Sequence, residues 1–181
     1  MSTPDADAPE EIAWKGDWII AKKRGRWEYA ARARDIRAAV ILAIEDGHII
    51  LVEQYRVPLG KRCLELPAGL IGDDEGGEND DPFSAATREL EEETGYRAAH
   101  WENCGEFFSS PGMVSEGFTL FKATGLEKIS DGGGTDSEYI TVHRVKLADF
   151  TQVIADFRSR GIGIDTRMLL ALGPHLLGEV S

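Results

Sequence analysis

The stretch of sequence that decides the fold runs from residue 81 to residue 96 and reads DPFSAATRELEEETGY. It predicts a helix over 82–94, with clear signals at both ends. Asp81 is a favourable N-cap residue, and Pro82 suits the first helical position because its fixed φ is already helical. Gly95 suits the left-handed residue that follows the last turn of a helix.

The predicted helix gathers acidic side chains on one side. When a helix turns by about 100° per residue, Glu89, Glu92 and Glu93 share one arc beside an apolar stripe, whereas Glu91 points elsewhere. Like charges at these spacings repel, so the cluster destabilises the bare helix. Carboxylate oxygens are also ligands that Mg²⁺ prefers. The cluster is therefore either a solvated helix face or a metal-binding face.

Charge is distributed unevenly along the chain. The whole sequence has a net charge of -12, and the 21 residues from Asp73 to Glu93 carry −9, because ten acidic residues accompany one arginine. The segment from Lys15 to Arg37 carries +5. Separate acidic and basic clusters suit a phosphate substrate that Mg²⁺ joins to carboxylates.

Length and composition exclude several classes of protein. The 181 residues are 42% hydrophobic, which suits one ordinary domain with a packed core. The longest apolar run, at 38–44, is too short to span a membrane, and the acidic residues 1–11 do not form a secretory signal. The negative net charge argues against nucleic acid as a partner. Cys63 and Cys104 are interpreted as reduced core thiols, which favours a cytoplasmic location.

Apolar alternation and turn signals predict the order of the remaining elements. Residues 1–11 are expected to form a mobile tail. Strands are predicted at 18–21, 27–32, 38–43, 48–54, 118–123 and 139–145, and further helices at 147–160 and 165–177. This order favours an α/β sandwich over a doubly wound sheet.

A recognisable signature lies between Gly69 and Tyr96. Five residues separate Gly69 from Glu75, twelve more follow, and the pattern Arg-Glu-Leu-x-Glu-Glu-x-Gly-Tyr then begins at Arg88. This resembles the signature of the Nudix hydrolases, Gly-x5-Glu-x7-Arg-Glu-U-x-Glu-Glu-x-Gly-U, where U is a bulky apolar residue. Every fixed residue is present, but the second gap is five residues longer, so Glu78 is an alternative to Glu75.

The resemblance implies both a fold and a domain organisation. The fold would be the Nudix α/β/α sandwich, with a mixed sheet and an N-terminal antiparallel strand region. The expected parts are a disordered tail at 1–11, a strand region for dimerisation and base binding at 12–37, and the Nudix hydrolase domain at 38–181.

Two more segments and one proline resemble the ADP-ribose pyrophosphatases of this family. The segments are EQYRVP at 53–58 and ELPAGLI at 65–71, and Pro111 lies 15 residues after the signature. The resemblance implies that Arg56 binds phosphate and that the carbonyl of Ala68 ligates a metal.

The implied metal site contains the carbonyl of Ala68 and the carboxylates of Glu89, Glu92 and Glu93. Two or three Mg²⁺ ions are expected per site, with Mn²⁺ as the alternative metal.

Two N-terminal segments, GDWII and WEY, resemble the tryptophan strands of dimeric ADP-ribose pyrophosphatases. The resemblance implies a homodimer with a shared active site, in which adenine stacks between Trp18 of one subunit and Trp27 of the other. Base–aromatic stacking is worth roughly 1–3 kcal/mol per base. Glu28 would accept a hydrogen bond from the adenine edge, and Arg32 would pair with a phosphate. The alternative is that both tryptophans are ordinary strand or interface residues.

The general base is expected on a glycine-rich loop late in the chain. The segment 130–138 contains three consecutive glycines that permit hinge motion. Glu138 at its end is preferred over Asp136, and Glu92 and Glu93 are the alternatives for the same role. Glu116, which follows Pro111 closely in the sequence, is the candidate on the substrate side.

The expected reaction is Mg²⁺-dependent hydrolysis of ADP-ribose to AMP and ribose 5-phosphate. One alternative is a Nudix hydrolase of another nucleoside diphosphate sugar, such as GDP-mannose. The other is a non-catalytic module that binds ADP-ribose, which would follow if the five-residue insertion spoiled the metal geometry.

Overall fold

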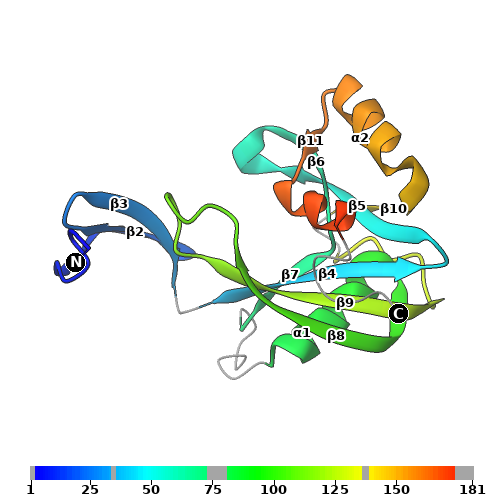
Figure 1. Ribbon diagram of the computed structural model, residues 1–181, viewed down its shortest axis with the longest axis horizontal. Coiled ribbons are helices and arrows are strands. Elements are labelled where there is room, and N and C mark those ends of the chain that lie inside the picture. The colour runs from blue at the N-terminus through cyan, green and yellow to red at the C-terminus, as the bar shows by residue number, and fades with distance from the viewer. Residues whose placement is uncertain (1–2, 34–35, 73–80, 136–138, 174–181) are drawn as a thin grey trace.

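The computed structural model describes residues 3–33, 36–72, 81–135 and 139–173. Within these ranges the chain forms a large mixed sheet, a separate N-terminal sheet, and helices on both faces of the large sheet (Figure 1). The expected α/β sandwich with an N-terminal antiparallel strand region is confirmed. The described helices are all too short or too polar to span a membrane.

The large sheet has the strand order β11-β6-β5-β4-β9-β8, with β10 paired to β5 and β7 paired to β4. Its strands are β4 (Arg37–Glu45), β5 (His48–Arg56), β6 (Lys61–Glu65), β7 (Ala68–Ile71), β8 (Tyr96–Phe108), β9 (Gly117–Lys128), β10 (Thr141–Lys146) and β11 (Gly163–Ile164). The sheet is mixed because β4 runs parallel to β9 and antiparallel to β5.

Strand β4 lies at the centre, and its side chains enter two separate cores. Val40 and Leu42 pack with one apolar cluster, and Ile41 packs with the other, because successive side chains of a strand point to opposite faces. The first cluster also contains residues of α2 (Phe150–Ser159) and η6 (Thr166–Leu172). The second contains residues of α1 (Pro82–Glu89). Burial on both faces explains why 38–44 is continuously apolar.

The predicted helix over 82–94 is present, but it changes type within its length. Asp81 is the N-cap, and its carboxylate accepts a hydrogen bond of 3.2 Å from the amide of Ser84. Helix α1 ends at Glu89, and the single π turn η4 (Leu90–Thr94) continues to Gly95, whose φ is 71°. A π turn advances by less than 100° per residue. The angular spacing of 100° per residue, which the prediction assumed over the whole helix, therefore does not hold beyond Leu90.

The N-terminal sheet contains β1 (Glu10–Lys15), β2 (Ile19–Arg24) and β3 (Trp27–Arg32) in that order. Strand β1 was not expected, and it begins at Glu10, within the segment expected to be a tail. The Glu10 carboxylate holds it there, because it pairs with Lys22 at 2.8 Å and accepts a hydrogen bond of 2.6 Å from Tyr29.

The sheet edges and the C-terminal part differ most from the prediction. Strands β6, β7 and β8 were not predicted, and β10 begins at Thr141 instead of residue 139. The helix expected over 147–160 is divided into the short 3₁₀ turn η5 (Leu147–Asp149) and α2. The helix expected over 165–177 is the 3₁₀ helix η6, and residues 174–177 lie outside the described part. A further 3₁₀ turn, η2 (Val57–Leu59), follows β5.

Candidate active site

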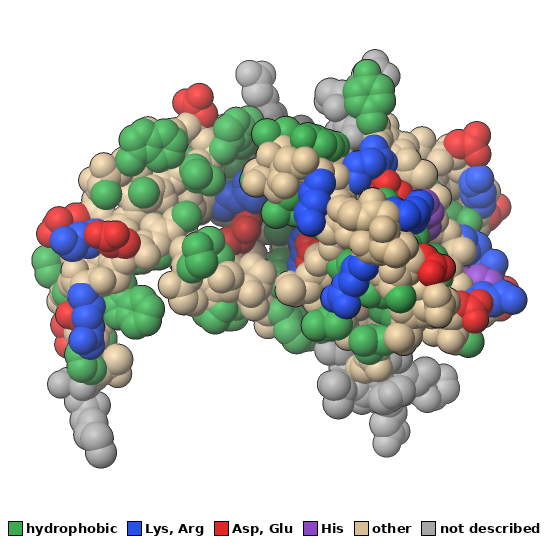
Figure 2. Space-filling model, turned by 90° about the horizontal axis from the view of Figure 1, so that it is seen from above, with side chains coloured by type: hydrophobic (Ala, Val, Ile, Leu, Met, Phe, Trp, Pro, Cys, Tyr) green, Lys and Arg blue, Asp and Glu red, His purple; other side chains and the backbone are tan. Residues whose placement is uncertain are grey.

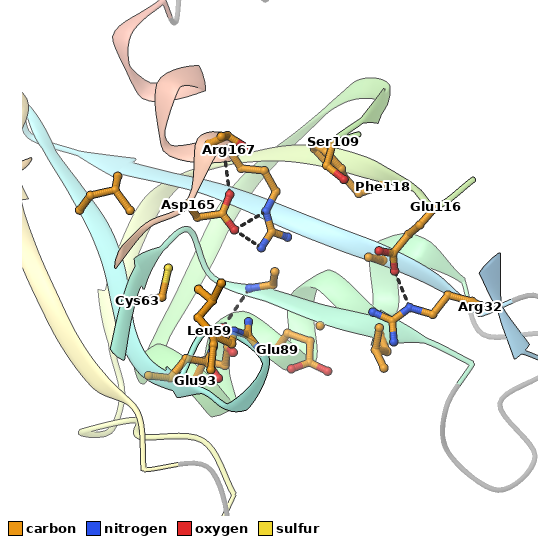
Figure 3. A pocket seen from close by; sticks show the side chains of 18 residues that line it. Arg32, Leu59, Cys63, Glu89, Glu93, Ser109, Glu116, Phe118, Asp165 and Arg167 are labelled. Atoms are coloured by element: carbon orange, nitrogen blue, oxygen red, sulfur yellow. Dashed lines mark hydrogen bonds and ion pairs between the residues drawn. The ribbon is translucent and has the colours of Figure 1, made fainter. Parts of the chain in front are cut away.

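A cleft of about 630 Å³ lies between the large sheet, α1 and η6, and Figure 3 shows the side chains around it. Its lining residues are Arg32, Ala38, Gln54, Arg56, Leu59, Cys63, Ala68, Gly69, Leu70, Glu89, Glu93, Ser109, Glu116, Phe118, Ile164, Asp165, Thr166 and Arg167. Six of the residues expected at the active site are in this set: Arg32, Arg56, Ala68, Glu89, Glu93 and Glu116.

Two carboxylates lie on the side of the cleft formed by α1 and η4. Glu93 is only 4% exposed, and its Oε2 accepts a hydrogen bond of 3.0 Å from the amide of Ala68. Glu89 packs against Gly69, where an added Cβ would lie 2.0 Å from the Glu89 side chain. Strand β7 therefore positions both carboxylates. The amide of Ala68 bonds to Glu93, and the absence of a side chain at Gly69 leaves room for Glu89.

The wall formed by β5 and β6 provides a fixed cation. Arg56 donates two hydrogen bonds of 2.7 Å to the carboxylate of Glu65, which is 1% exposed. These bonds raise the pKa of Arg56 above its ordinary value. Bidentate pairing fixes the direction of a guanidinium group, so Arg56 is held ready to bind an anion.

A second cation lies at the end of the cleft near the N-terminal sheet. Nε of Arg32 donates a hydrogen bond of 2.5 Å to Glu116, across 84 positions of the sequence. Figure 3 shows this pair on the opposite side of the cleft from Asp165 and Arg167. The structure thus brings together a strand residue and a loop residue that were both expected near the substrate.

The Asp165–Arg167 pair was not predicted as part of the site. Asp165 accepts hydrogen bonds from the backbone and the guanidinium group of Arg167. Burial acts to raise the pKa of Asp165, but the bonds and charge of Arg167 lower it overall. The available sequence signal was Asp165 as a helix N-cap, which explains its local role and says nothing about the distant cleft.

The cleft also contains a cysteine. Burial raises the pKa of Cys63 to about 12. Its thiol is therefore protonated at neutral pH and is a poor nucleophile. Cys63 and Cys104 are both free thiols.

Several expected residues lie outside this cleft. Trp27 lines a separate cleft of about 400 Å³ together with Tyr29 and Pro111. Trp18 lines neither cleft, and Glu28 is exposed.

Glu92 is exposed and is absent from the lining of the main cleft. Four expected or alternative residues lie outside the described residues: Glu75, Glu78, Asp136 and Glu138.

The donor set in the cleft suits a hard divalent cation without forming a closed cage. Across 3–33, 36–72, 81–135 and 139–173, no group of three His, Cys, Asp or Glu side chains is close enough to hold a metal ion. Mg²⁺ commonly uses one or two carboxylates and keeps waters and substrate phosphates as its other ligands. Glu89, Glu93 and the Ala68 carbonyl match that open kind of site.

The loop after β9 is attached by backbone hydrogen bonds to η4, the turn that carries Glu92 and Glu93. The amides of Gly133 and Gly134 donate to the carbonyls of Glu93 and Glu92, at 2.9 and 3.0 Å. Gly132 has a φ of 64°, and an added Cβ would lie 2.4 Å from the carbonyl carbon of Thr94. Glycines are therefore required where this loop meets the helix.

Known proteins resemble this chain in sequence and in fold. The family described as NUDIX domain matches residues 33–160. A Bacillus methanolicus protein named methanol dehydrogenase activator is 40% identical over 121 residues, which are 66% of this chain and 63% of that protein. An ADP-ribose pyrophosphatase from Bacillus subtilis is 37% identical over 117 residues, 64% of this chain and 60% of the relative. The chain thus matches less than two thirds of the length of either relative.

A solved structure extends the likeness to the three-dimensional fold. The structure titled "Crystal structure of ADP compounds hydrolase" has a TM-score of 0.67 at 22% identity, and the match covers 93% of this chain and 91% of the other. At that identity the likeness concerns the fold alone. With the family matched over most of the chain and the signature carboxylates placed in a cleft, this protein belongs to the Nudix family.

Proposed function

We propose that this protein is a Mg²⁺-dependent pyrophosphohydrolase that cleaves ADP-ribose to AMP and ribose 5-phosphate. The observation that carries the proposal is a single cleft that contains both carboxylates and arginines. Glu89 and Glu93 lie on one side of it. Arg56 and Arg32, each paired with an acid of the chain, lie on other sides. A diphosphate needs both kinds of group, because it binds cations and accepts hydrogen bonds from guanidinium groups. Relatives named ADP-ribose pyrophosphatase support this choice of substrate.

Each charged residue has a distinct role in the proposed reaction. Glu89, Glu92, Glu93 and the Ala68 carbonyl would hold two or three Mg²⁺ ions, with Mn²⁺ as an alternative. When bound, such ions neutralise the diphosphate and lower the pKa of a coordinated water. Arg56 and Arg32 orient the two phosphates for in-line attack, because their guanidinium groups are already directed by buried or half-buried acids.

The proton of the attacking water is proposed to pass to a carboxylate. Glu138 is the first choice, and Glu92 and Glu93 are the alternatives. The attachment of Gly133 and Gly134 to the helix end supports Glu138, because it brings the beginning of that loop next to Glu93. Glu116 is proposed to act on the substrate side through its pair with Arg32.

The adenine is proposed to stack between Trp18 of one subunit and Trp27 of the other, with Glu28 at the base edge. Ile19 pairs with Arg32, and Arg24 pairs with Trp27, so the tryptophans lie at opposite ends of the hairpin. At about 3.3 Å per residue this separation is roughly 20 Å. Two rings that sandwich a purine lie roughly 7 Å apart, so one chain cannot supply both.

A homodimer removes this difficulty, because a two-fold axis repeats every interface contact. The region 12–37 is proposed to serve dimerisation and base binding, and the remainder to form the hydrolase domain. We also propose a cytoplasmic location, which is supported by the two free thiols.

A substrate panel tests the proposed activity. The purified protein is incubated with ADP-ribose, GDP-mannose, NADH and diadenosine polyphosphates, with and without Mg²⁺, and the products are identified. We expect AMP and ribose 5-phosphate from ADP-ribose, and only with the metal. Faster cleavage of GDP-mannose would favour another nucleoside diphosphate sugar. Binding of ADP-ribose without cleavage would favour a non-catalytic module.

A further inference from the structure

A charged side chain from the C-terminal part of the chain faces the cleft and has no role so far. We propose that Arg167 is a diphosphate-binding residue, held across the cleft from Glu89 and Glu93 by the acids Asp165 and Glu65. The proposal rests on the proposed function, because it assumes that the cleft receives a diphosphate.

The first observation is that the backbone around Arg167 is fixed relative to the cleft wall. Strand β11 pairs in parallel with β6, with Ile164 next to Leu64. The amide of Asp165 then donates a hydrogen bond of 3.0 Å to the carbonyl of Leu64. Helix η6 therefore begins at a defined place beside Glu65, although the two segments are about a hundred residues apart in sequence.

The second observation is the number of bonds that direct the guanidinium group. Asp165 Oδ2 accepts from Nε at 2.9 Å and from Nη2 at 2.5 Å, and Glu65 Oε2 lies 3.4 Å from the same Nη2. The Asp165 Oδ1 accepts from the backbone amide of Arg167 at 2.7 Å. Among the described residues, none accepts a hydrogen bond from Nη1. Figure 3 shows the group pointing into the cleft from the η6 side.

The third observation is the order of burial in this network. The Glu65 side chain is 2% exposed, whereas the side chains of Arg167 and Arg56 are 20% and 40% exposed. The shared acid therefore lies behind the two arginines, which separate it from the cleft. An anion in the cleft would meet guanidinium groups from two directions, and of the described carboxylates only Asp165 lines the cleft on that side.

Charge balance explains why these arginines form ion pairs with acids of the chain. Arg56 and Arg167 are paired with Glu65 and Asp165, so no buried charge is left uncompensated when the cleft holds no anion. A diphosphate then adds charge-assisted hydrogen bonds to donors whose direction is already fixed. An arginine with a purely structural role would stabilise the fold without changing affinity for the anion, and this difference can be measured.

The test compares Arg167→Gln with Arg144→Gln, which removes the same charge from an exposed position on β10. Binding of inorganic pyrophosphate at fixed Mg²⁺ is measured by calorimetry, and KM and kcat for ADP-ribose are measured in parallel. Losing hydrogen bonds to a charged group corresponds to about a 10- to 100-fold loss of affinity. We expect that loss for Arg167→Gln and a change below about twofold for the Arg144 variant.

Arg167→Lys provides the second variant, because it keeps the charge and removes the planar fork. We expect weaker pyrophosphate binding than in the wild-type protein, with an unchanged Tm; if Arg167→Gln fails to fold, this variant decides alone. Wild-type affinity for pyrophosphate in either folded variant would overturn the proposal, including the case in which only Tm falls. If the wild-type protein does not cleave ADP-ribose, the proposed function fails, while pyrophosphate binding still decides the role of Arg167.

Discussion

The cleft and the N-terminal sheet expose opposite kinds of side chain. In the cleft, each acid or arginine described above already has a partner within the chain, and Glu93 is almost fully buried, as is Glu65 behind Arg56. The N-terminal sheet instead presents large apolar side chains to solvent, and Figure 2 shows apolar groups gathered over that end of the molecule. They include Ile12, Trp14, Trp18, Ile19 and Trp27, each between 47 and 60% exposed.

The difference indicates which part of the site one chain completes by itself. The groups that we propose for phosphate and metal binding are directed by contacts within the chain, so we expect this half of the site to need no partner. A contiguous exposed apolar surface usually marks an interface. Substitutions in the cleft should therefore change the chemistry of each subunit, and substitutions in the N-terminal sheet should change base affinity and association.

The largest expected effect is that of Glu93→Gln. The amide oxygen can still accept the hydrogen bond from Ala68, so the fold should remain, but the buried negative charge is lost. Loss of such a group lowers the rate by roughly 10²–10⁴-fold. The measurement is kcat at saturating Mg²⁺, and near-normal turnover would remove Glu93 from the catalytic site.

Glu91→Gln is the matched control for that experiment. Glu91 lies on the same π turn, but it pairs with Arg97 on the surface at 2.7 Å. Exposed pairs of this kind contribute about 0–1 kcal/mol to stability. We expect almost unchanged activity and a small decrease in Tm.

The second effect concerns the position of a carboxylate without removal of its charge. In Gly69→Ala the new methyl group would meet Glu89 at 2.0 Å, so the carboxylate must move. A displacement of about 1 Å can lower a rate by roughly 10²-fold. Gly112→Ala is the control, because nothing lies within 4 Å of its added Cβ. Equal kcat values in the two variants would mean that Glu89 need not occupy its present position.

These two predictions also separate what the sequence reveals from what it does not. Asp81, Pro82 and Gly95 are local signals, so both ends of the helix could be predicted from neighbouring residues. The π turn has no such signal, and for that reason Glu92 and Glu93 were placed on one face, although only Glu93 lines the cleft.

Long-range pairing sets a second limit on prediction. All 13 residues of strand β8 are half-buried or exposed, and its apolar residues do not alternate regularly with polar ones, so it lacks the pattern that identifies a strand. Arg167 reaches Glu65 across 102 positions, and a one-dimensional pattern cannot encode that meeting. The roles of Glu138 and of the five-residue insertion concern residues outside the described part, and they remain predictions.

The third effect belongs to the N-terminal sheet. Trp18→Ala and Trp27→Ala should each raise KM for ADP-ribose by about tenfold, because a stacking contact is worth roughly 1–3 kcal/mol. The effect on kcat should be smaller, since stacking binds the ground state and the transition state alike. Steady-state kinetics with a sedimentation measurement of mass provide the test.

Mixing the two tryptophan variants distinguishes a shared site from an independent one. Heterodimers would contain one complete pair of tryptophans and one site that lacks both, so part of the affinity should return. A fully active monomer of about 20 kDa, or proven subunit exchange without recovery, would contradict the shared site.

The smallest expected effect is that of deleting residues 76–80. This segment, GGEND, contains no large apolar side chain, so it adds little to a core. Its removal restores the spacing of the family signature, and we expect Tm and kcat within about twofold of the wild-type values. A collapse of activity in a folded deletion variant would instead assign a catalytic role to Glu78 or Asp80.

The two backbone bonds from Gly133 and Gly134 to the π turn connect loop opening to fraying of the helix end. An amide hydrogen exchanges with solvent only when its bond breaks. Deuterium uptake at these two glycines therefore reports how often the loop separates from the carboxylate-bearing turn. If a bound diphosphate slows that uptake, the loop closes together with the cleft, and isotope exchange would detect this without any measurement of turnover.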